Sequence, residues 1–361
     1  MKKKISAILV LTLLLSLLSA CGATGGAEAP AAETPAETQE SAETPVEPSA
    51  EAPAETPATA EDNALPRLMV LAGPTGVGAA KLMADNEAAA DADKVVASAE
   101  VVADNEMVKN ALVSGETDIA AAATNLAATL YNKAGGSLEV LAVNTLGVLY
   151  ILENGESVQS MADLAGKTLY ATGQGANPEY VLNYLLDKNG VDAANVNIQW
   201  MTPQEVTAKM TSGEGGICML PVPAATAVLM KAEGVRQALS LSEVWDAVGE
   251  GPLAQGCIVV RREFAEQHPD AVARFLDAYR ASIDFMSAEA NRAEAAELVA
   301  KYEITPNAQI AAKAIPQCNL TCLTGGEMKS ALEGFYQVML SADPASIGGA
   351  MPDAAFYYGA D

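Results

Sequence analysis

Apolar residues follow two alternating patterns from Leu65 to the end of the chain. Short continuous apolar runs over residues 68–71, 95–102 and 118–122 predict buried strands. The runs over 95–102 and 118–122 are each followed by a segment in which apolar residues have helical spacing. The segment after 95–102 ends near Gly115. Alternation of strands with helices is typical of α/β proteins, so the pattern predicts an α/β fold.

The same alternation starts again after a long apolar run over residues 138–152. Further strands are expected over 168–172, 196–200, 217–220 and 256–260, with one more element over 235–241. Helices are expected over 79–89, 105–113, 125–133, 160–165, 178–188, 203–210, 224–232, 269–286, 293–302, 307–315 and 327–340.

Two similar α/β blocks followed by a helical C-terminal tail predict two lobes. Residues 65–146 and 254–361 would form lobe 1, and residues 147–253, inserted between them, would form lobe 2. The chain would cross between the lobes near 144–150 and 251–257. Ligands of open α/β sheets bind beyond the carboxyl ends of the strands, so we expect a ligand cleft between the lobes.

The N-terminus carries an export signal. Three lysines precede an apolar run over 5–18 that is too short to be read as a spanning helix, and small residues follow it. Leu18-Ser19-Ala20-Cys21 resembles the lipobox of bacterial lipoproteins. That resemblance implies removal of a signal peptide over 1–20 and a lipid, with acyl chains such as palmitate, on Cys21. The alternative is an ordinary secretory signal in which Cys21 is incidental.

Residues 21–64 hold the lipidated cysteine and a tether. From residue 22 the segment consists mainly of Ala, Glu, Pro and Thr, and it contains no Lys or Arg. Such a segment has too few large apolar residues to offset the entropy of ordering, so we expect a disordered tether. A flexible coil of this length spans roughly 35 Å. The protein would then be held at the outer face of the cytoplasmic membrane.

The charge of the chain limits its partners. The formal net charge is −25, and about −18 remains once the three signal lysines and the ten acidic tether residues are set aside. The part of the chain after the tether is therefore strongly acidic. This excludes nucleic acid as a partner, because nucleic-acid binding needs a basic surface, and it excludes binding to anionic lipid by charge. A monomer of this length buries a core of its own.

Cysteine and histidine usage predicts neither a metal nor another cofactor. Cys318 and Cys322 have C-x3-C spacing, which is poor for zinc, and the only histidine is His268. We favour buried free thiols over a Cys318–Cys322 disulfide, because Cys218 and Cys257 lie in apolar runs.

Three loops at strand-to-helix junctions are candidate binding loops, because helix-start N–H groups there point beyond the sheet. They are residues 73–78, residues 172–177 and the pair Thr124-Asn125. The first loop fits neither the P-loop nor the dinucleotide spacing. For each loop the alternative is a helix cap and turn needed only for folding. Asn177, just before Pro178, is expected to be an N-cap, and a cap is the favoured interpretation of Thr124-Asn125.

Several segments resemble the solute-binding lipoproteins of ABC importers, in the group for nitrate, sulfonate, taurine and thiamine-pyrimidine precursors. They are the segments 73–82, 115–120, 164–168 and 171–175. The resemblance implies a type II periplasmic-binding-protein fold, capture of a solute by lobe closure, and delivery to a membrane permease with its ATPase. Many relatives have glutamate between two prolines where this chain has Pro221-Val222-Pro223, so a cation-binding carboxylate is not carried over.

The candidate ligand contacts are uncharged. They include no arginine, and Lys81 is expected to lie a turn into its helix. A di- or trianion would recruit a guanidinium group, so we expect a neutral or singly charged small organic solute. Trp245 is expected in a lobe core. The candidates are Thr75, Gly76, Thr124, Asn125, Thr145, Thr172, Gln174, Asn177 and Tyr180.

Two other classes of function share some of these features. An enzyme on the same fold would need a general base, and His268, just before a helix, is better explained as a solvated residue near a cap. No catalytic residue is therefore expected. A ligand-sensing surface lipoprotein without a permease shares the same features, and the sequence does not separate it from a transport protein.

Overall fold

The computed structural model describes residues 64–248 and 251–360. The predicted signal peptide, Cys21 and all but the last residue of the predicted tether lie outside these residues. Among the helices in the described part, none is long and apolar enough to cross a membrane.

The first sheet has six strands in the order β11-β4-β10-β3-β1-β2. Strand β1 pairs in parallel with β2 and β3, whereas β10 is antiparallel to β3 and β4, and β11 is antiparallel to β4. The strands are β1 (Arg67–Leu71), β2 (Ser98–Val102), β3 (Ile119–Ala123), β4 (Leu138–Thr145), β10 (Gly256–Arg261) and β11 (Leu320–Leu323).

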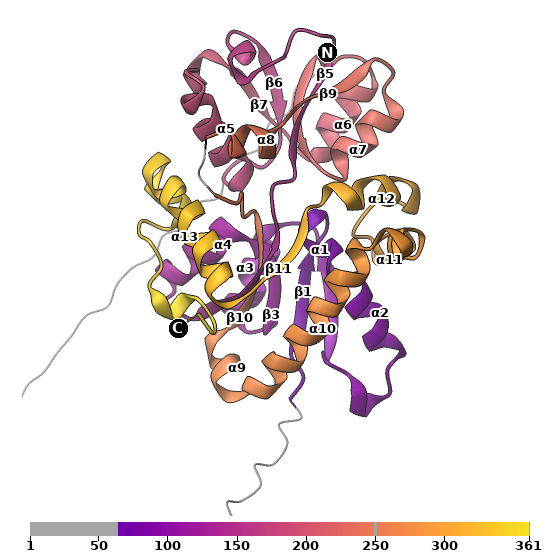
Figure 1. The fold of residues 1–361 in the computed structure, drawn as a ribbon, viewed down its shortest axis with the longest axis vertical. Coiled ribbons are helices and arrows are strands. Elements are labelled where there is room, and N and C mark those ends of the chain that lie inside the picture. Colours follow the sequence, from indigo (N-terminus) through magenta and orange to yellow (C-terminus); the bar gives the residue numbers. More distant parts are fainter. Residues whose placement is uncertain (1–63, 249–250, 361) are drawn as a thin grey trace, which may run out of the picture. The chain divides into compact units, whose positions relative to one another are not determined.

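The second sheet has five strands in the order β7-β6-β8-β5-β9. It is built from one continuous part of the chain, and β5 is antiparallel to both of its neighbours. The strands are β5 (Leu149–Asn154), β6 (Thr168–Ala171), β7 (Asn197–Trp200), β8 (Ile217–Pro221) and β9 (Val235–Ser240). We call the first sheet with its helices lobe 1 and the second sheet with its helices lobe 2 (Figure 1).

Helices flank both sheets (Figure 1). Those of lobe 1 are α1 (Pro74–Val77), α2 (Ala80–Ala88), α3 (Asn105–Ser114), α4 (Thr124–Lys133), α9 (Arg262–Gln267), α10 (Pro269–Ser287), α11 (Arg292–Lys301), α12 (Ala308–Ala314) and α13 (Gly325–Ala342). Those of lobe 2 are α5 (Asn177–Lys188), α6 (Pro203–Thr211), α7 (Ala224–Lys231) and α8 (Leu241–Asp246). The chain passes between the lobes after β4 and again after α8.

Because β1, β2 and β3 are parallel, the loops that follow them lie at the same edge of the sheet. Leu71 pairs with Val102 at the ends of β1 and β2, and Met69 of β1 pairs with Ala120 of β3. Parallel strands end at the same edge of a sheet, so the three following loops gather there. Local signals then start the helices: Asp104 accepts a hydrogen bond from the Met107 N–H, and Gly115 ends α3 in the left-handed conformation.

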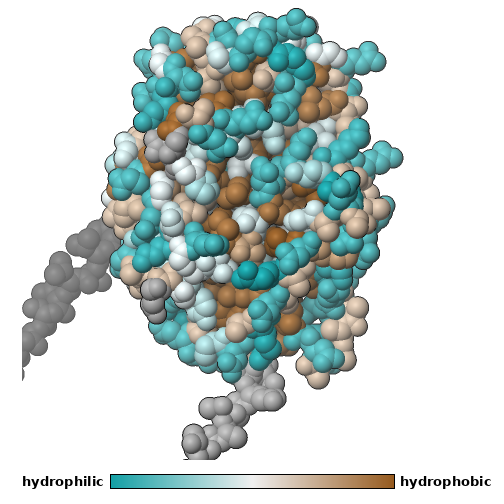
Figure 2. Space-filling model, viewed as in Figure 1, coloured by the Kyte–Doolittle hydropathy of each residue, from teal (hydrophilic) through white to brown (hydrophobic). Residues whose placement is uncertain are grey.

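The hydrophobic cores of the two lobes contain most of the apolar runs from which the elements were predicted. Trp245 is fully buried and packs against Tyr184 and Phe335, with ring centroids 5.2 and 5.7 Å apart. On the face in Figure 2, hydrophilic side chains cover much of the outer edge and hydrophobic ones gather toward the middle. The predicted α/β class is confirmed, and so is the burial of Trp245.

Several predictions about elements were incomplete. Helix α9 was missed, and the helix expected over 160–165 is a 3-10 helix over Met161–Leu164. The helix expected over 79–89 starts at Ala80, and a separate turn, α1, precedes it within the glycine loop. The region after 235 holds both β9 and α8. Strand β11 was missed because its residues are only half-buried and its four positions carry no alternation.

The four described cysteines are free thiols. Cys218, Cys257 and Cys318 are buried, and Cys322 in β11 is half-buried. Burial raises the pKa of the Cys218 thiol to about 12, and that of Cys318 likewise, so both are inert at neutral pH.

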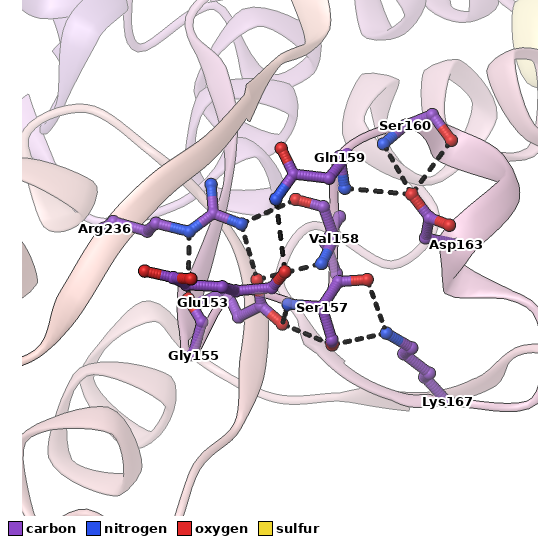
Figure 3. A network of polar contacts seen from close by, with 10 residues as sticks. Glu153, Gly155, Ser157, Val158, Gln159, Ser160, Asp163, Lys167 and Arg236 are labelled. Atoms are coloured by element: carbon purple, nitrogen blue, oxygen red, sulfur yellow. Dashed lines mark hydrogen bonds and ion pairs between the residues drawn. The ribbon is translucent and has the colours of Figure 1, made fainter.

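A buried carboxylate organises the loop that follows β5 (Figure 3). Glu153 accepts hydrogen bonds from the Ser157 N–H at 2.8 Å and the Val158 N–H at 3.0 Å, and it pairs with Arg236 at 2.8 Å. Arg236 also donates to the carbonyl oxygens of Gly155 and Val158. Burial raises the pKa of Glu153, but these hydrogen bonds and the nearby cation outweigh burial and hold it below its ordinary value.

Glu153→Gln should therefore cost about 1–3 kcal/mol of unfolding free energy at pH 7. A carboxyl group with a lowered pKa in the folded state adds stability above its unfolded pKa, about 4.3, and loses it as the pH falls through the folded pKa. Urea unfolding at pH 7 and pH 3 should show a smaller loss on acidification in Glu153→Gln than in wild type. The exposed neighbour variant Glu156→Gln should match wild type at both pH values, and equal acid sensitivity in Glu153→Gln would contradict this role.

Candidate functional site

A cavity of about 280 Å³ lies between the two lobes, at the carboxyl ends of β1, β2 and β3. Residues from lobe 1, from lobe 2 and from both crossings line it. They are Leu71, Ala72, Pro74, Thr75, Ala103, Asp104, Asn105, Ala123, Val148, Leu149, Thr172, Gly173, Ala176, Asn177, Pro178, Pro203, Pro221 and Gln255. Its size suits a small organic molecule, whereas a second cavity beside Arg261, of about 20 Å³, holds no more than a water.

Prolines at helix starts form much of the wall. Pro74, Pro178 and Pro203 each occupy the first turn of a helix, α1, α5 and α6 respectively. Proline is favoured at this position because it lacks an N–H that would be unpaired there. The lining is therefore rigid, with apolar rings between a few polar groups.

Thr75 is held in place from two sides. Asn144 donates from its side-chain amide to the Thr75 carbonyl oxygen at 2.9 Å and to the Tyr279 hydroxyl at 2.8 Å. Gly73, at a φ of 100°, donates its N–H to the Ile304 carbonyl oxygen. These contacts fix the loop backbone. The hydroxyl of Thr75, a cavity-lining residue, has no hydrogen-bond partner among residues 64–248 and 251–360.

Asn177 and Thr124 meet across the lobes. The Asn177 side-chain amide donates to the Thr124 hydroxyl at 2.9 Å and to the Gln255 carbonyl oxygen at 2.8 Å. The Thr124 hydroxyl donates in turn to the Ala254 carbonyl oxygen at 2.8 Å. The cap predictions were wrong here: Ala176 and Ala123 are the N-caps of α5 and α4, and neither helix has a side-chain cap bond. Both side chains bond to distant residues instead.

Of the nine predicted contacts, Thr75, Thr172 and Asn177 line the cavity, and Thr124 lies one hydrogen bond behind Asn177. Gly76 is buried against Leu71, and Thr145 donates to the Asn144 side chain. Asn125 is buried, Gln174 is exposed, and Tyr180 is half-buried against the core. These five residues are not among the cavity lining, and their role in binding stays a prediction.

The lining carries little charge. Asp104 is its one ionisable residue, and that carboxylate already caps α3 by accepting from the Met107 N–H at 3.0 Å. Lysine and arginine are absent from the lining residues. Lys81 pairs with Asp85 on α2, and His268 lies between α9 and α10 with its ring 4.9 Å from that of Phe264. Within residues 64–248 and 251–360 no group of acidic, histidine or cysteine side chains gathers that could hold a metal ion.

Sequence reasoning missed several lining residues. Asp104 and Asn105 follow the predicted strand that ends at 102, so the rule that selected the other loops would have selected them too. No local pattern pointed to Gln255. Its side-chain oxygen accepts a hydrogen bond from the Val148 N–H at 2.8 Å, and this bond joins the two segments that cross between the lobes. That pairing depends on residues 107 positions apart.

Comparisons with known proteins agree with this architecture. A sequence search of curated proteins gave no match. An ABC transporter structure from Parabacteroides distasonis superposes with a TM-score of 0.68 at 24% identity, covering 81% of this chain and 98% of that one. The periplasmic aliphatic sulphonate-binding protein of Escherichia coli gives a TM-score of 0.63 at 18% identity, covering 81% and 91%. The periplasmic nitrate-binding protein of Synechocystis PCC 6803 gives 0.55 at 14% identity, covering 79% and 85%.

These likenesses confirm the predicted fold, the two-lobed type II fold of periplasmic binding proteins. The family model described as NMT1/THI5 like matches residues 103–293. That range covers more than half of the 361 residues and includes β3 to β10. The chain belongs to the NMT1/THI5-like family.

Proposed function

We propose that this chain is an extracytoplasmic solute-binding lipoprotein that captures a small organic molecule in the cavity and delivers it to an ABC import permease. The observation that carries the proposal is the cavity itself, which is lined from both lobes and from both crossings. Similarity to binding proteins of importers supports it.

The solute of this proposal is neutral or singly charged. Two relatives are named for binding sulphonate and nitrate, which are anions. In this chain the lining offers threonine hydroxyls, amides and one carboxylate, with no guanidinium or ammonium group among the lining residues. The Asp104 carboxylate in the lining opposes an anion, whereas hydroxyls and amides suit uncharged polar groups.

In the proposed mechanism the solute is bound by residues of both lobes, so binding raises the population of the closed form. The gain is limited to the difference in affinity between the closed and open forms. Thr75 of lobe 1 and Thr172 of lobe 2, both lining residues, are the proposed solute contacts. In this proposal the two bodies that move are the predicted lobes, residues 65–146 with 254–361 and residues 147–253.

The rest of the proposal concerns where the protein is held in the cell. Lipid on Cys21 would anchor the protein at the outer face of the cytoplasmic membrane, with 21–64 as tether and the folded part acting as a monomer. Each buried CH2 adds about 0.8 kcal/mol to membrane affinity. Mass spectrometry of the protein from membranes tests the anchor: a lipidated Cys21 N-terminus supports it, and an intact N-terminus from Met1 contradicts it.

A thermal-shift screen tests the solute class. A bound solute raises the apparent stability by mass action, by about 2.7 kcal/mol at a hundredfold excess over Kd. Vitamins, nucleobases and amino-acid derivatives should include compounds that raise the melting temperature. Stabilisation only by solutes with two or three negative charges, such as phosphonates, would contradict the proposed solute class.

Thr75→Val should weaken binding of a solute found in this way by roughly three- to tenfold, because valine keeps the shape but loses the hydroxyl. The melting temperature without solute should stay near that of wild type, since this hydroxyl has no partner within the described part of the chain. Thr75→Ser, which keeps the hydroxyl, should bind nearly as wild type in calorimetry. If both variants bind equally well, Thr75 does not contact the solute.

A further inference from the structure

We propose that Asn177 is a positioning residue that latches lobe 2 onto lobe 1, so that it acts on binding through lobe closure and not as a solute contact. The proposal rests on the lobe movement of the proposed function and revises the sequence-based role of Asn177. It is carried by side-chain hydrogen bonds that join the lobes directly.

The latch consists of three residues. Asn177 is the first residue of α5 in lobe 2 and is only 2% exposed. Its amide nitrogen donates to the Thr124 hydroxyl of α4 and to the Gln255 carbonyl oxygen at the start of β10, both in lobe 1. Each distance is below 3.0 Å, so both hydrogen bonds are well formed.

Neighbouring contacts fix the receiving side. Gln255 donates its N–H to the Thr145 carbonyl oxygen at 3.0 Å, and its carbonyl oxygen also accepts from the Thr124 N–H at 3.3 Å. The Tyr336 hydroxyl of α13 donates to the Thr124 carbonyl oxygen at 2.8 Å. The acceptors for Asn177 are therefore rigid parts of lobe 1, and the angle between the lobes must suit them.

The orientation of the Asn177 amide is determined by its partners. A backbone carbonyl oxygen can only accept, so the group facing Gln255 must be the amide nitrogen. The Asn177 side-chain oxygen then points away from both partners, and it is buried without a hydrogen-bond partner in the described structure. Because almost none of this oxygen is accessible, it is unsuited to hold a solute in the cavity.

The unpaired oxygen makes the latch reversible. A buried acceptor without a donor is costly, and water would hydrate it once the lobes part. The two donated hydrogen bonds favour closure, and the dehydrated oxygen opposes it. Their opposition leaves the closed and open forms close in free energy, so a small change at Asn177 or Thr124 should shift the populations.

Distances between spin labels on the two lobes test the latch without any solute. Cysteines at the exposed positions Asn110 of α3 and Gln204 of α6 flank the cavity, since Asn105 and Pro203 at the starts of these helices line it. The full chain would also carry Cys21→Ser and Cys322→Ser, because the other cysteines are buried. Asn177→Ala removes both latch bonds, Thr124→Val removes the bond to the Thr124 hydroxyl, and Thr124→Ser keeps both.

We expect wild type and Thr124→Ser to share one distance distribution, in which short and long distances are both populated. In Asn177→Ala and Thr124→Val the ratio of long to short distances should rise roughly tenfold, the effect of one to two lost hydrogen bonds. Asn197→Ala, at an exposed site within lobe 2, is the matched control and should leave the distances unchanged.

Unchanged distances in both latch variants would overturn the proposal and assign closure to the apolar contact between Trp245 and Phe335, which also joins the lobes. A wild type that shows only the long distance would overturn it as well. A failed solute screen with the expected distances would contradict the proposed function but not the latch.

Discussion

Gly76→Ala is expected to lower the free energy of unfolding by about 3 kcal/mol, within the range for overpacking of a closed site. A methyl group at this position would collide with the Leu71 carbonyl oxygen, closer than real Cβ atoms approach, and that oxygen is backbone that cannot swing aside. The Ile304 side chain lies 3.5 Å away on the same side. The loop that carries Thr75 must therefore move, and solute affinity should fall with it. Urea unfolding and calorimetry measure the two effects.

Gly326→Ala is the matched control. Gly326 lies in the first turn of α13, and a Cβ built on it meets nothing within 4 Å. Alanine there should leave solute binding unchanged and add up to about 1 kcal/mol of stability, because glycine is a poor helix former. Equal stability of Gly76→Ala and wild type would show that the loop can shift without cost, which would contradict its rigid placement of Thr75.

Asp118→Ala is expected to lower the free energy of unfolding by about 3 kcal/mol, because it removes the buried carboxylate that pairs with both Arg67 and Arg261. The Asp118 carboxylate accepts from Arg67 Nε at 2.8 Å and Nη2 at 2.7 Å, and from Arg261 Nη2 at 3.2 Å. Its side chain is 6% exposed, against 42% for Arg67 and 24% for Arg261. Both cations keep access to water, which limits the loss. These contacts join β1 and β10 at the end of the sheet opposite the cavity, so binding should be preserved.

The same carboxylate should add to the acid sensitivity of the protein. Burial raises the pKa of Asp118, but hydrogen bonds from Arg67 and the charges of Arg67 and Arg261 outweigh burial and lower it. Its stabilising effect is complete above the unfolded pKa of about 3.9 and disappears as the pH falls through the folded value. Asp85→Ala, which removes an exposed pair with Lys81, should change stability by less than about 0.5 kcal/mol. A loss that small in Asp118→Ala would contradict the account.

Local patterns predicted the fold well because its strands are continuous apolar runs and its helices have clear starts and stops. Strand β11 escaped because four half-buried residues at the edge of a sheet carry no pattern of their own. Its place depends on pairing with β4, whose residues lie far away in the sequence.

The site was predicted less completely, for the same reason. The loops after β1 and β6 were found from their glycines, and they supply Thr75, Thr172 and Gly173 to the cavity. Asn177 lines the cavity, but its assignment as a cap was wrong, because its hydrogen-bond partners, Thr124 and Gln255, are 53 and 78 residues away. A cap is a local pattern, whereas a contact between lobes depends on the completed fold.

Calorimetry with a cavity-blocking variant tests the central claim, that the cavity between the lobes is the solute site. Ala103 lines the cavity and is exposed, so Ala103→Trp should fill part of the space without disturbing the core. With the best solute from the thermal screen, wild type should bind one molecule per chain. Ala103→Trp should bind at least about a hundredfold more weakly at an unchanged melting temperature, because the ring occupies the volume that the solute needs. Equal affinity of the two proteins would place the solute elsewhere and contradict the account.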